Sequence, residues 1–159
     1  MRTVGLGIAW DELTTGERFK TIKRTITEAD LVNFINVTGM VEMIFTDATF
    51  SETHGSIKGG RPVPGMLVYG FCEGLLVQST MQMTGLAMLE TNLKVIGPTN
   101  VGDTIHCEVE VLSVRPTSKG DRGIVGTRNN AVNQHGETVL TYDVVRMMAS
   151  RAGRDEAAG

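Results

Sequence analysis

The sequence lacks the surplus of positive charge that nucleic-acid binding requires. Its 159 residues carry 15 Lys and Arg against 18 Asp and Glu, a formal net charge of -3. Such a chain has no excess of cations with which to neutralise phosphates. Aromatic residues make up only 5% of the chain, too few for a surface on which bases stack. We therefore expect no nucleic-acid partner.

Cysteines and long apolar runs are also scarce. Cys72 and Cys107 form neither a disulfide framework nor a zinc-ligand pattern, and both lie in apolar segments typical of buried thiols. The longest apolar stretch, 65–77, is interrupted by Glu73 and is too short to span a bilayer. Residues 1–10 contain one arginine and no apolar run, unlike a secretory signal. We expect a cytoplasmic protein with no membrane partner and no bound metal.

The composition is that of one globular domain. Hydrophobic residues make up 41% of the chain and charged residues 21%, which is enough apolar material for a sizeable core. We place the single domain at residues 1–150. Residues 151–159 are small and charged, and we expect them to form a flexible C-terminal tail.

The first half of the chain predicts a strand followed by helices. Residues 18–26 are rich in Thr and Ile and indicate a strand. Thr27 and Asp30 have the spacing of a capping box, so a helix is expected to begin there and to end at Gly39. A short helix capped by Thr46 or Asp47 should follow, ending near Gly55.

A long helix is predicted over residues 66–83, after a loop rich in Gly and Pro. It is apolar on nearly all sides and should be buried all round. Four strands are then expected, over residues 86–96, 104–115, 123–133 and 137–150. Apolar and polar residues alternate in the second of these, which predicts a solvent-facing His106. His135 falls in a turn, and neither histidine is given a role. The order suggests an α+β fold with an antiparallel sheet around one helix.

Four segments of the chain resemble the hotdog fold, and within it the MaoC-like dehydratase and (R)-specific enoyl-CoA hydratase family. They are residues 16–27, 34–47 (FINVTGMVEMIFTD), 60–67 (GRPVPGML) and 100–104 (NVGDT). The resemblance implies addition or removal of water on an acyl thioester, carried by CoA or acyl-carrier protein, with no cofactor. It also implies a homodimer or higher oligomer whose clefts form at the subunit interface.

The sequence departs from this family at its catalytic dyad. In the family frame the Asp and His, five residues apart, fall on Met40 and Phe45. Hydration needs a base for the water and an acid for the α-carbon, and neither Met nor Phe carries an ionisable proton. No Asp followed five residues later by His occurs anywhere in the chain. The ordinary dyad mechanism therefore cannot operate on these side chains.

Three other residues are candidates for the proton transfers. Glu42 lies inside the altered motif, where a partly desolvated carboxylate would have a raised pKa and could act as a base. It could equally be a loop carboxylate in solvent. His54, near the loop, could act as an acid or lie on the surface. Asp47 fits a helix cap better than a catalytic role.

The loop before the long helix supplies the candidate substrate-binding residues. Amides at the start of a helix carry partial positive charge and could polarise a thioester carbonyl at Gly65. A glycine there permits close approach, although it could also simply follow Pro64 into the helix. Val63 and Met66 flank the same point. Arg61 could meet a CoA phosphate or be solvated.

Glu73 is an alternative acid–base residue. By its spacing it shares a helix face with Gly65 and Tyr69. One branch of hotdog thioesterases, which this chain resembles here, uses a carboxylate at about this place. A carboxylate in an otherwise apolar helix also needs a partner or solvent, so Glu73 could instead pair across a subunit interface or point into water.

Three hypotheses follow. The first is a hydratase or dehydratase that uses Glu42, with His54 or Asp47, in place of the dyad. The second is an inert thioester-binding subunit that pairs with a dyad-bearing hotdog chain in a heteromer. The third is an acyl-CoA thioesterase that works through Glu73.

Overall fold

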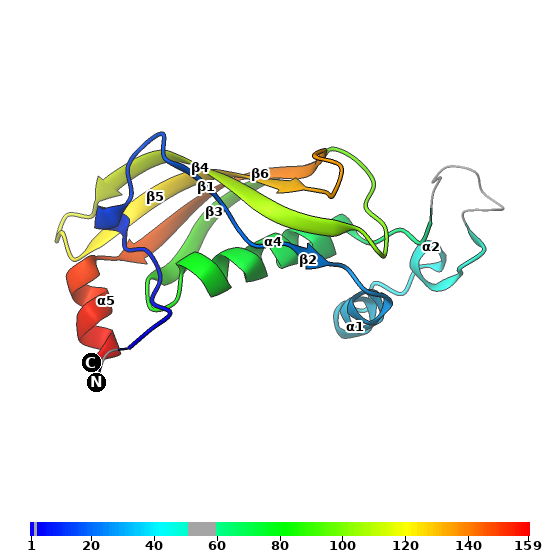
Figure 1. The fold of residues 1–159 in the computed structure, drawn as a ribbon, viewed down its shortest axis with the longest axis horizontal. Helices are drawn as coiled ribbons and strands as arrows, with labels where there is room; N and C mark the ends of the chain where they lie inside the picture. Colours follow the sequence, from blue (N-terminus) through cyan, green and yellow to red (C-terminus); the bar gives the residue numbers. More distant parts are fainter. Residues whose placement is uncertain (2, 51–59) are drawn as a thin grey trace.

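An antiparallel sheet curves around one helix, α4 (Gly65–Thr80), in a computed structural model that describes residues 1, 3–50 and 60–159 (Figure 1). The strands run in the order β1-β4-β5-β6-β3, and β2 also pairs with β4. Their bounds are β1 (Arg18–Lys20), β2 (Arg24–Thr25), β3 (Gly85–Val95), β4 (Thr104–Pro116), β5 (Arg122–Val132) and β6 (Thr138–Ala149). In these ranges no helix is long and apolar enough to cross a membrane.

The predicted first strand is divided into β1 and β2. Between them, the Thr21 hydroxyl takes the place of a backbone carbonyl and accepts a 2.9 Å hydrogen bond from the Cys107 amide. The pairing with β4 is therefore interrupted at residues 21–23. The composition of residues 18–26 does not predict this interruption. The four later strands form as predicted, within a few residues at each end.

Helix α1 (Glu28–Thr38) begins and ends where its local sequence predicts. The Thr27 hydroxyl accepts from the Asp30 amide, and the Asp30 carboxylate accepts from the Thr27 amide at 2.8 Å. Gly39 closes the helix with a φ of 73°, which favours glycine. A one-turn helix, α2 (Met43–Thr46), follows. This helix ends where the predicted short helix, capped by Thr46 or Asp47, should begin. Most of the predicted helix lies outside the described residues.

The core lies between α4 and the inner face of the sheet. Leu67, Cys72 and Leu76 of α4 pack against residues from β4 and β6 in one hydrophobic cluster. Both cysteines are buried as predicted, and contact with Cys72 together with burial raises the pKa of the Cys107 thiol. The prediction that α4 is buried all round is wrong for the single chain. Met66 and Val77 are exposed along the side of the helix that the sheet does not cover.

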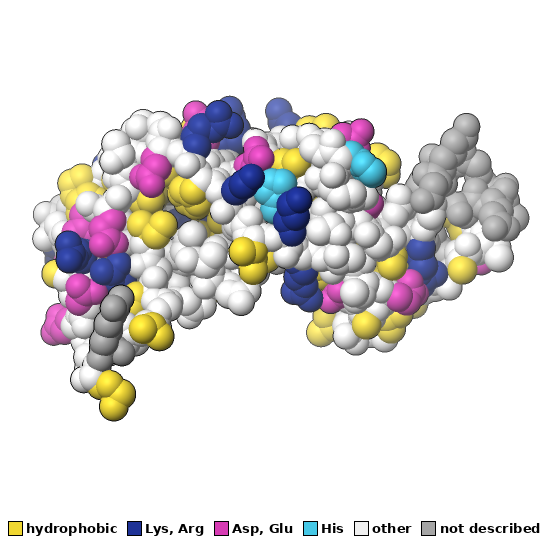
Figure 2. Space-filling model, viewed as in Figure 1, with side chains coloured by type: hydrophobic (Ala, Val, Ile, Leu, Met, Phe, Trp, Pro, Cys, Tyr) yellow, Lys and Arg dark blue, Asp and Glu magenta, His cyan; other side chains and the backbone are white. Residues whose placement is uncertain are grey.

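The outer face of the sheet carries alternating charges. Four residues form a row across neighbouring strands, with charges that alternate in sign. In strand order they are Arg18 of β1, Glu110 of β4, Arg128 of β5 and Asp143 of β6. Arg128 donates two 2.8 Å hydrogen bonds to Asp143 and lowers the pKa of that carboxyl. Figure 2 shows basic and acidic side chains interspersed over one face rather than gathered by sign.

His106 is buried, at 8% exposure, and the prediction that it faces solvent is wrong. Strands β1 and β2 pair with β4 on either side of it, so residues 21–23 pass beside the ring. Its Nε2 atom lies 3.3 Å from Glu108 Oε1. The period-two pattern places the residue on the correct face but does not reveal this cover.

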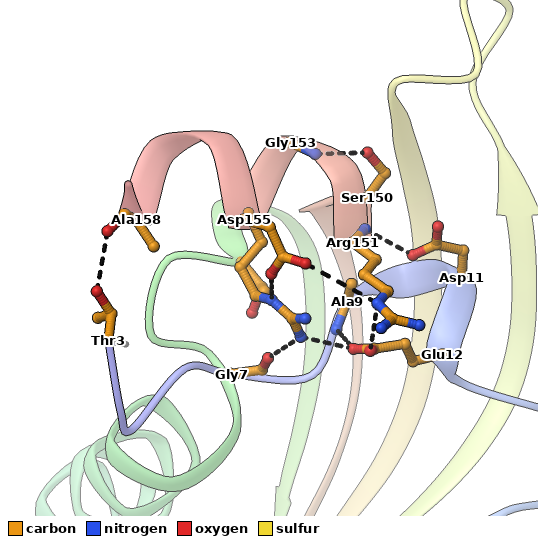
Figure 3. A network of polar contacts seen from close by, with 12 residues as sticks. Thr3, Gly7, Ala9, Asp11, Glu12, Ser150, Arg151, Gly153, Asp155 and Ala158 are labelled. Carbon is orange, nitrogen blue, oxygen red and sulfur yellow. Dashed lines mark hydrogen bonds and ion pairs between the residues drawn. The ribbon is translucent and has the colours of Figure 1, made fainter. Parts of the chain in front are cut away.

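The predicted flexible tail is instead a helix, α5 (Arg151–Ala158), held against the N-terminal segment (Figure 3). The Ser150 hydroxyl caps it by accepting from the Gly153 amide at 3.2 Å. Arg154 donates to the Gly7 carbonyl at 2.8 Å and to Glu12, in the short helix η1 (Trp10–Glu12), at 2.7 Å. These contacts join residues far apart in sequence, so local composition could not predict them.

Candidate functional site

The altered motif forms the connection from α1 to α2. Phe45, which the resemblance would place at the family's histidine position, packs against the hydrophobic core and is partly buried. Met40, which it would place at the aspartate position, follows the glycine that ends α1 and is partly exposed. The Phe45 side chain thus contributes to packing, and neither Phe45 nor Met40 can exchange a proton.

Glu42 stands at the N-terminal boundary of α2. Its backbone carbonyl accepts from the amides of Phe45 and Thr46 at 2.9 and 3.0 Å, which fixes the main chain. Its side chain is exposed and has no hydrogen bond or ion pair with any residue that the structure describes. The partial burial expected of a base is not found in the single chain, and none of the described side chains occupies the carboxylate.

The other two residues grouped with Glu42 have different outcomes. Asp47 is the C-cap residue of α2, and its carboxylate accepts from the amide and the hydroxyl of Thr49, at 2.9 and 2.7 Å. Its predicted role as the N-cap of a following helix stays a prediction, because that helix lies mostly outside the described residues. His54 lies outside the described residues, so its candidacy stays a prediction.

The loop leading to α4 is held by the turn before β4. The Val63 amide donates to the Thr99 carbonyl at 3.0 Å, and the Val101 amide donates to the Arg61 carbonyl at 2.9 Å. Pro62 forms an isolated bridge with Asn100. These bonds fix the direction in which the chain enters the helix at Pro64, its N-cap.

Gly65, the first residue of α4, lies against Val95 at the end of β3. A Cβ atom at this position would lie 2.8 Å from Cγ2 of Val95, so no larger residue fits without displacement. The first turn of a helix leaves amides without intrahelical acceptors, and here they border a cavity of about 70 Å³. Val63, Gly65, Val68 and Val95 line it together with Val139, Leu140 and residues 97–99. Met66 points away and is exposed.

Arg61 is occupied by an ion pair. Its Nε atom lies 2.7 Å from Oε1 of Glu28, at the start of α1, and its side chain is mostly buried. The contact joins the loop to α1. A role in binding a CoA phosphate stays a prediction.

Glu73 is fully engaged beneath the sheet. Its Oε1 atom accepts from the Tyr142 hydroxyl and from Nη2 of Arg146, both at 2.6 Å, and Oε2 lies 2.8 Å from the same nitrogen. The ring of Tyr69 packs edge-on against that of Tyr142, with centroids 4.9 Å apart. Burial, Cys107 and Glu73 together raise the pKa of Tyr142. Glu73 therefore pairs within its own chain, not across a subunit interface or with solvent alone, and both carboxylate oxygens are engaged. A thioesterase role for Glu73 stays a prediction, and it would require this ion pair to open.

Sequence reasoning missed Tyr142 and Arg146. The alternation in β6 already places both on one face of the strand, and their inward direction follows once Val144 between them is taken as core. Within the described ranges no group of three or more His, Cys, Asp or Glu could hold a metal ion.

Residues 13–142 match the family described as FAS1-like, dehydratase domain region. The chain belongs to this family. Protein MaoC of Klebsiella aerogenes is 31% identical over 113 residues, which are 71% of this chain and 32% of that protein. The chain thus spans about a third of the length of this curated relative.

Two solved structures carry the same fold over most of this FAS1-like dehydratase chain. A MaoC-like dehydratase from Rhodospirillum rubrum is 26% identical, with a TM-score of 0.79, over 91% of this chain and 99% of that one. R-hydratase PhaJ1 from Pseudomonas aeruginosa is 26% identical, with a TM-score of 0.71, over 91% and 86%. The α+β hotdog fold and the MaoC-like dehydratase and R-hydratase family are confirmed.

Proposed function

We propose that this chain adds water to, or removes it from, an acyl thioester, with Glu42 as the acid–base group. Family membership supports the reaction class. Of the three candidate carboxylates, Asp47 and Glu73 are engaged by neighbouring side chains, whereas Glu42 has no partner among the described residues. That contrast is the observation that carries the assignment of Glu42.

One carboxylate is sufficient for the proton transfers. Glu42 takes a proton from water as the oxygen bonds to the β-carbon of the enoyl group, and then gives that proton to the α-carbon. The C=C double bond becomes a single bond, one C–O and one C–H bond form, and the carboxylate is regenerated. Negative charge develops meanwhile on the thioester oxygen, which the amides at Gly65 and Met66 would stabilise. Dehydration is the reverse.

Gly65 tests the thioester-binding part of this proposal. In Gly65→Ala the new methyl group would lie 2.8 Å from Val95, so the start of α4 or the Val95 side chain has to shift and the cavity beside the α4 amides changes shape. We expect KM for the thioester to rise about tenfold or more, because positioning is sensitive to shifts of about 1 Å. Gly70→Ala, on the same helix with nothing within 4 Å of the added atom, is the matched control. Equal KM values for the two variants would contradict the role of Gly65.

We further propose that a second copy of this chain covers the free edge of β3. Leu86, Met88, Leu89 and Val95 are 43–59% exposed on this edge strand or at its ends, an aggregation hazard unless paired. Antiparallel pairing of two β3 strands centred on Asn92 puts Glu90 opposite Lys94 twice, by symmetry. Because Val95 also lines the Gly65 cavity, the second copy would adjoin the thioester site.

A charge exchange tests this pairing. Lys94→Glu places two like charges opposite each other on both sides of the symmetry axis, so we expect the dimer Kd to rise roughly tenfold or more. The double variant Glu90→Lys with Lys94→Glu restores both pairs and should recover the original Kd. Analytical ultracentrifugation measures all three. A dimer that Lys94→Glu leaves unchanged would contradict this register.

The inert subunit is the second candidate, and Met40 and Phe45 favour it. Mass spectrometry of 2-enoyl-, 3-hydroxyacyl- and saturated acyl-CoA thioesters, incubated with the purified protein, separates the possibilities. Gain or loss of one water supports the hydratase. Unchanged thioesters that react once a dyad-bearing hotdog chain is added would support a heteromeric binding subunit. Released CoA would indicate hydrolysis.

A further inference from the structure

A small cavity of about 20 Å³ lies between the C-terminal half of α4 and the inner face of the sheet. Most of its wall is apolar, including Leu76 and Met81. Four polar side chains also border it, those of Thr80, Thr127, Asn129 and Arg146. It is separate from the Gly65 cavity, and nothing in the hydration chemistry above uses it.

Two of these polar side chains have unpaired atoms. Asn129 is 0% exposed, and both its Nδ2 and Oδ1 atoms lack a hydrogen-bond partner in the described part of the chain. Arg146 uses Nη2 to bind Glu73, while its buried Nε atom has no partner there either. Leaving a buried polar group unsatisfied costs more free energy than a typical hydrogen bond gains. The unpaired atoms of Asn129 and Arg146 therefore require a hydrogen-bond partner other than the described residues.

The geometry brings the two side chains to one place. Asn129 lies directly opposite Tyr142 in the β5–β6 register. The Tyr142 hydroxyl and Arg146 Nη2 both donate to Oε1 of Glu73. The guanidinium of Arg146 therefore lies near the Tyr142 hydroxyl, and Tyr142 is the β6 residue paired with Asn129. Both then border the same cavity, one offering a donor and the other a donor and an acceptor.

The size of the cavity and its chemistry together indicate the ligand. A water molecule needs roughly 10–15 Å³ of such space and two to four polar partners. The cavity of about 20 Å³ therefore holds one water but no larger molecule. Arg146 is already neutralised by Glu73, so an anion would gain little.

We propose that Asn129 and Arg146 bind one internal water molecule in this cavity. The water accepts from the Arg146 Nε–H group and donates to Asn129 Oδ1, and so hydrates the side of the guanidinium that faces away from Glu73. An open pocket of about 210 Å³ at the start of β3 shares Met81 and Arg146 with the cavity. The flexible Met81 side chain gives the water a path for exchange.

Asn129→Leu tests the proposal through the sign of its effect. With water bound, leucine displaces it and leaves Arg146 Nε unpaired, so the melting temperature should fall by roughly 3–10 °C. If the cavity is dry, the same change removes two unpaired polar atoms and should raise the melting temperature. Asn130→Leu, at the neighbouring position on the outer face, is the matched control and should have little effect.

A crystal structure of the unmodified protein provides a second, independent measurement. We expect electron density for a water within hydrogen-bond distance of both Asn129 and Arg146 Nε. A cavity without density would overturn the proposal whatever the melting temperature does, and so would a direct hydrogen bond between Asn129 and Arg146. A higher melting temperature for Asn129→Leu would overturn it as well.

Discussion

Glu42→Gln should lower kcat for hydration of a 2-enoyl thioester by about 10²- to 10⁴-fold, the usual contribution of a positioned acid–base group. Glutamine keeps the size and polarity of the side chain but cannot take a proton from water or return one to the α-carbon. Because the Glu42 side chain bonds to no described residue, and its backbone bonds do not depend on the side chain, the substitution breaks no contact within that part of the chain. We therefore expect the fold and KM to change little, so that the loss is confined to kcat.

The matched control for Glu42→Gln is Glu156→Gln. Glu156 is also an exposed glutamate, but it lies on α5 at the opposite end of the sheet (Figure 1). Its replacement removes the same charge from the protein and should leave kcat unchanged. If Glu42→Gln retains more than about a tenth of the activity, Glu42 is not the acid–base group.

Arg146→Met should lower the free energy of unfolding by about 3–5 kcal/mol, because it leaves the Glu73 carboxylate buried without its cation. Among the described side chains, Glu73 then keeps only the Tyr142 hydroxyl as a hydrogen-bond donor. Among the substitutions proposed here, this one should lower the free energy of unfolding most. Urea denaturation measures it.

Two comparisons separate the buried ion pair from a general effect of arginine loss. The double variant Glu73→Leu with Arg146→Met removes both charges and should recover most of the stability, since apolar replacements of buried pairs are often neutral. Arg128→Met breaks an exposed pair with Asp143 and should change stability far less. If Arg146→Met is no worse than Arg128→Met, the buried pair does not have the structural importance assigned to it.

Local sequence signals predicted those parts of the fold that local interactions determine. Thr27 and Asp30 cap α1 through their own backbone, and Gly39 ends it through its own φ. The alternation in β4 likewise needs no knowledge of the partner strand. The hotdog topology itself came from the family resemblance, because the strand order depends on contacts that no local pattern contains.

The errors all concern long-range contacts. The α5 helix depends on Glu12 and Gly7, and the cover over His106 depends on where β1 ends. The same distinction between local signals and long-range contacts applies to the candidate functional site. The position of Gly65 at the start of α4 could be predicted from the local sequence. The engagement of Glu73 required knowledge that Arg146, 73 residues later, donates to it.

The most direct test of the central claim is hydration in water enriched in ¹⁸O. The purified protein alone is incubated with 2-enoyl-CoA, in parallel with Glu42→Gln, and the thioesters are weighed by mass spectrometry. Our account predicts a 3-hydroxyacyl thioester that carries one ¹⁸O with the unmodified protein, and an initial rate of ¹⁸O incorporation about 10²- to 10⁴-fold lower with the variant. Equal ¹⁸O incorporation by the two proteins, or none by either across a range of acyl chains, would contradict it.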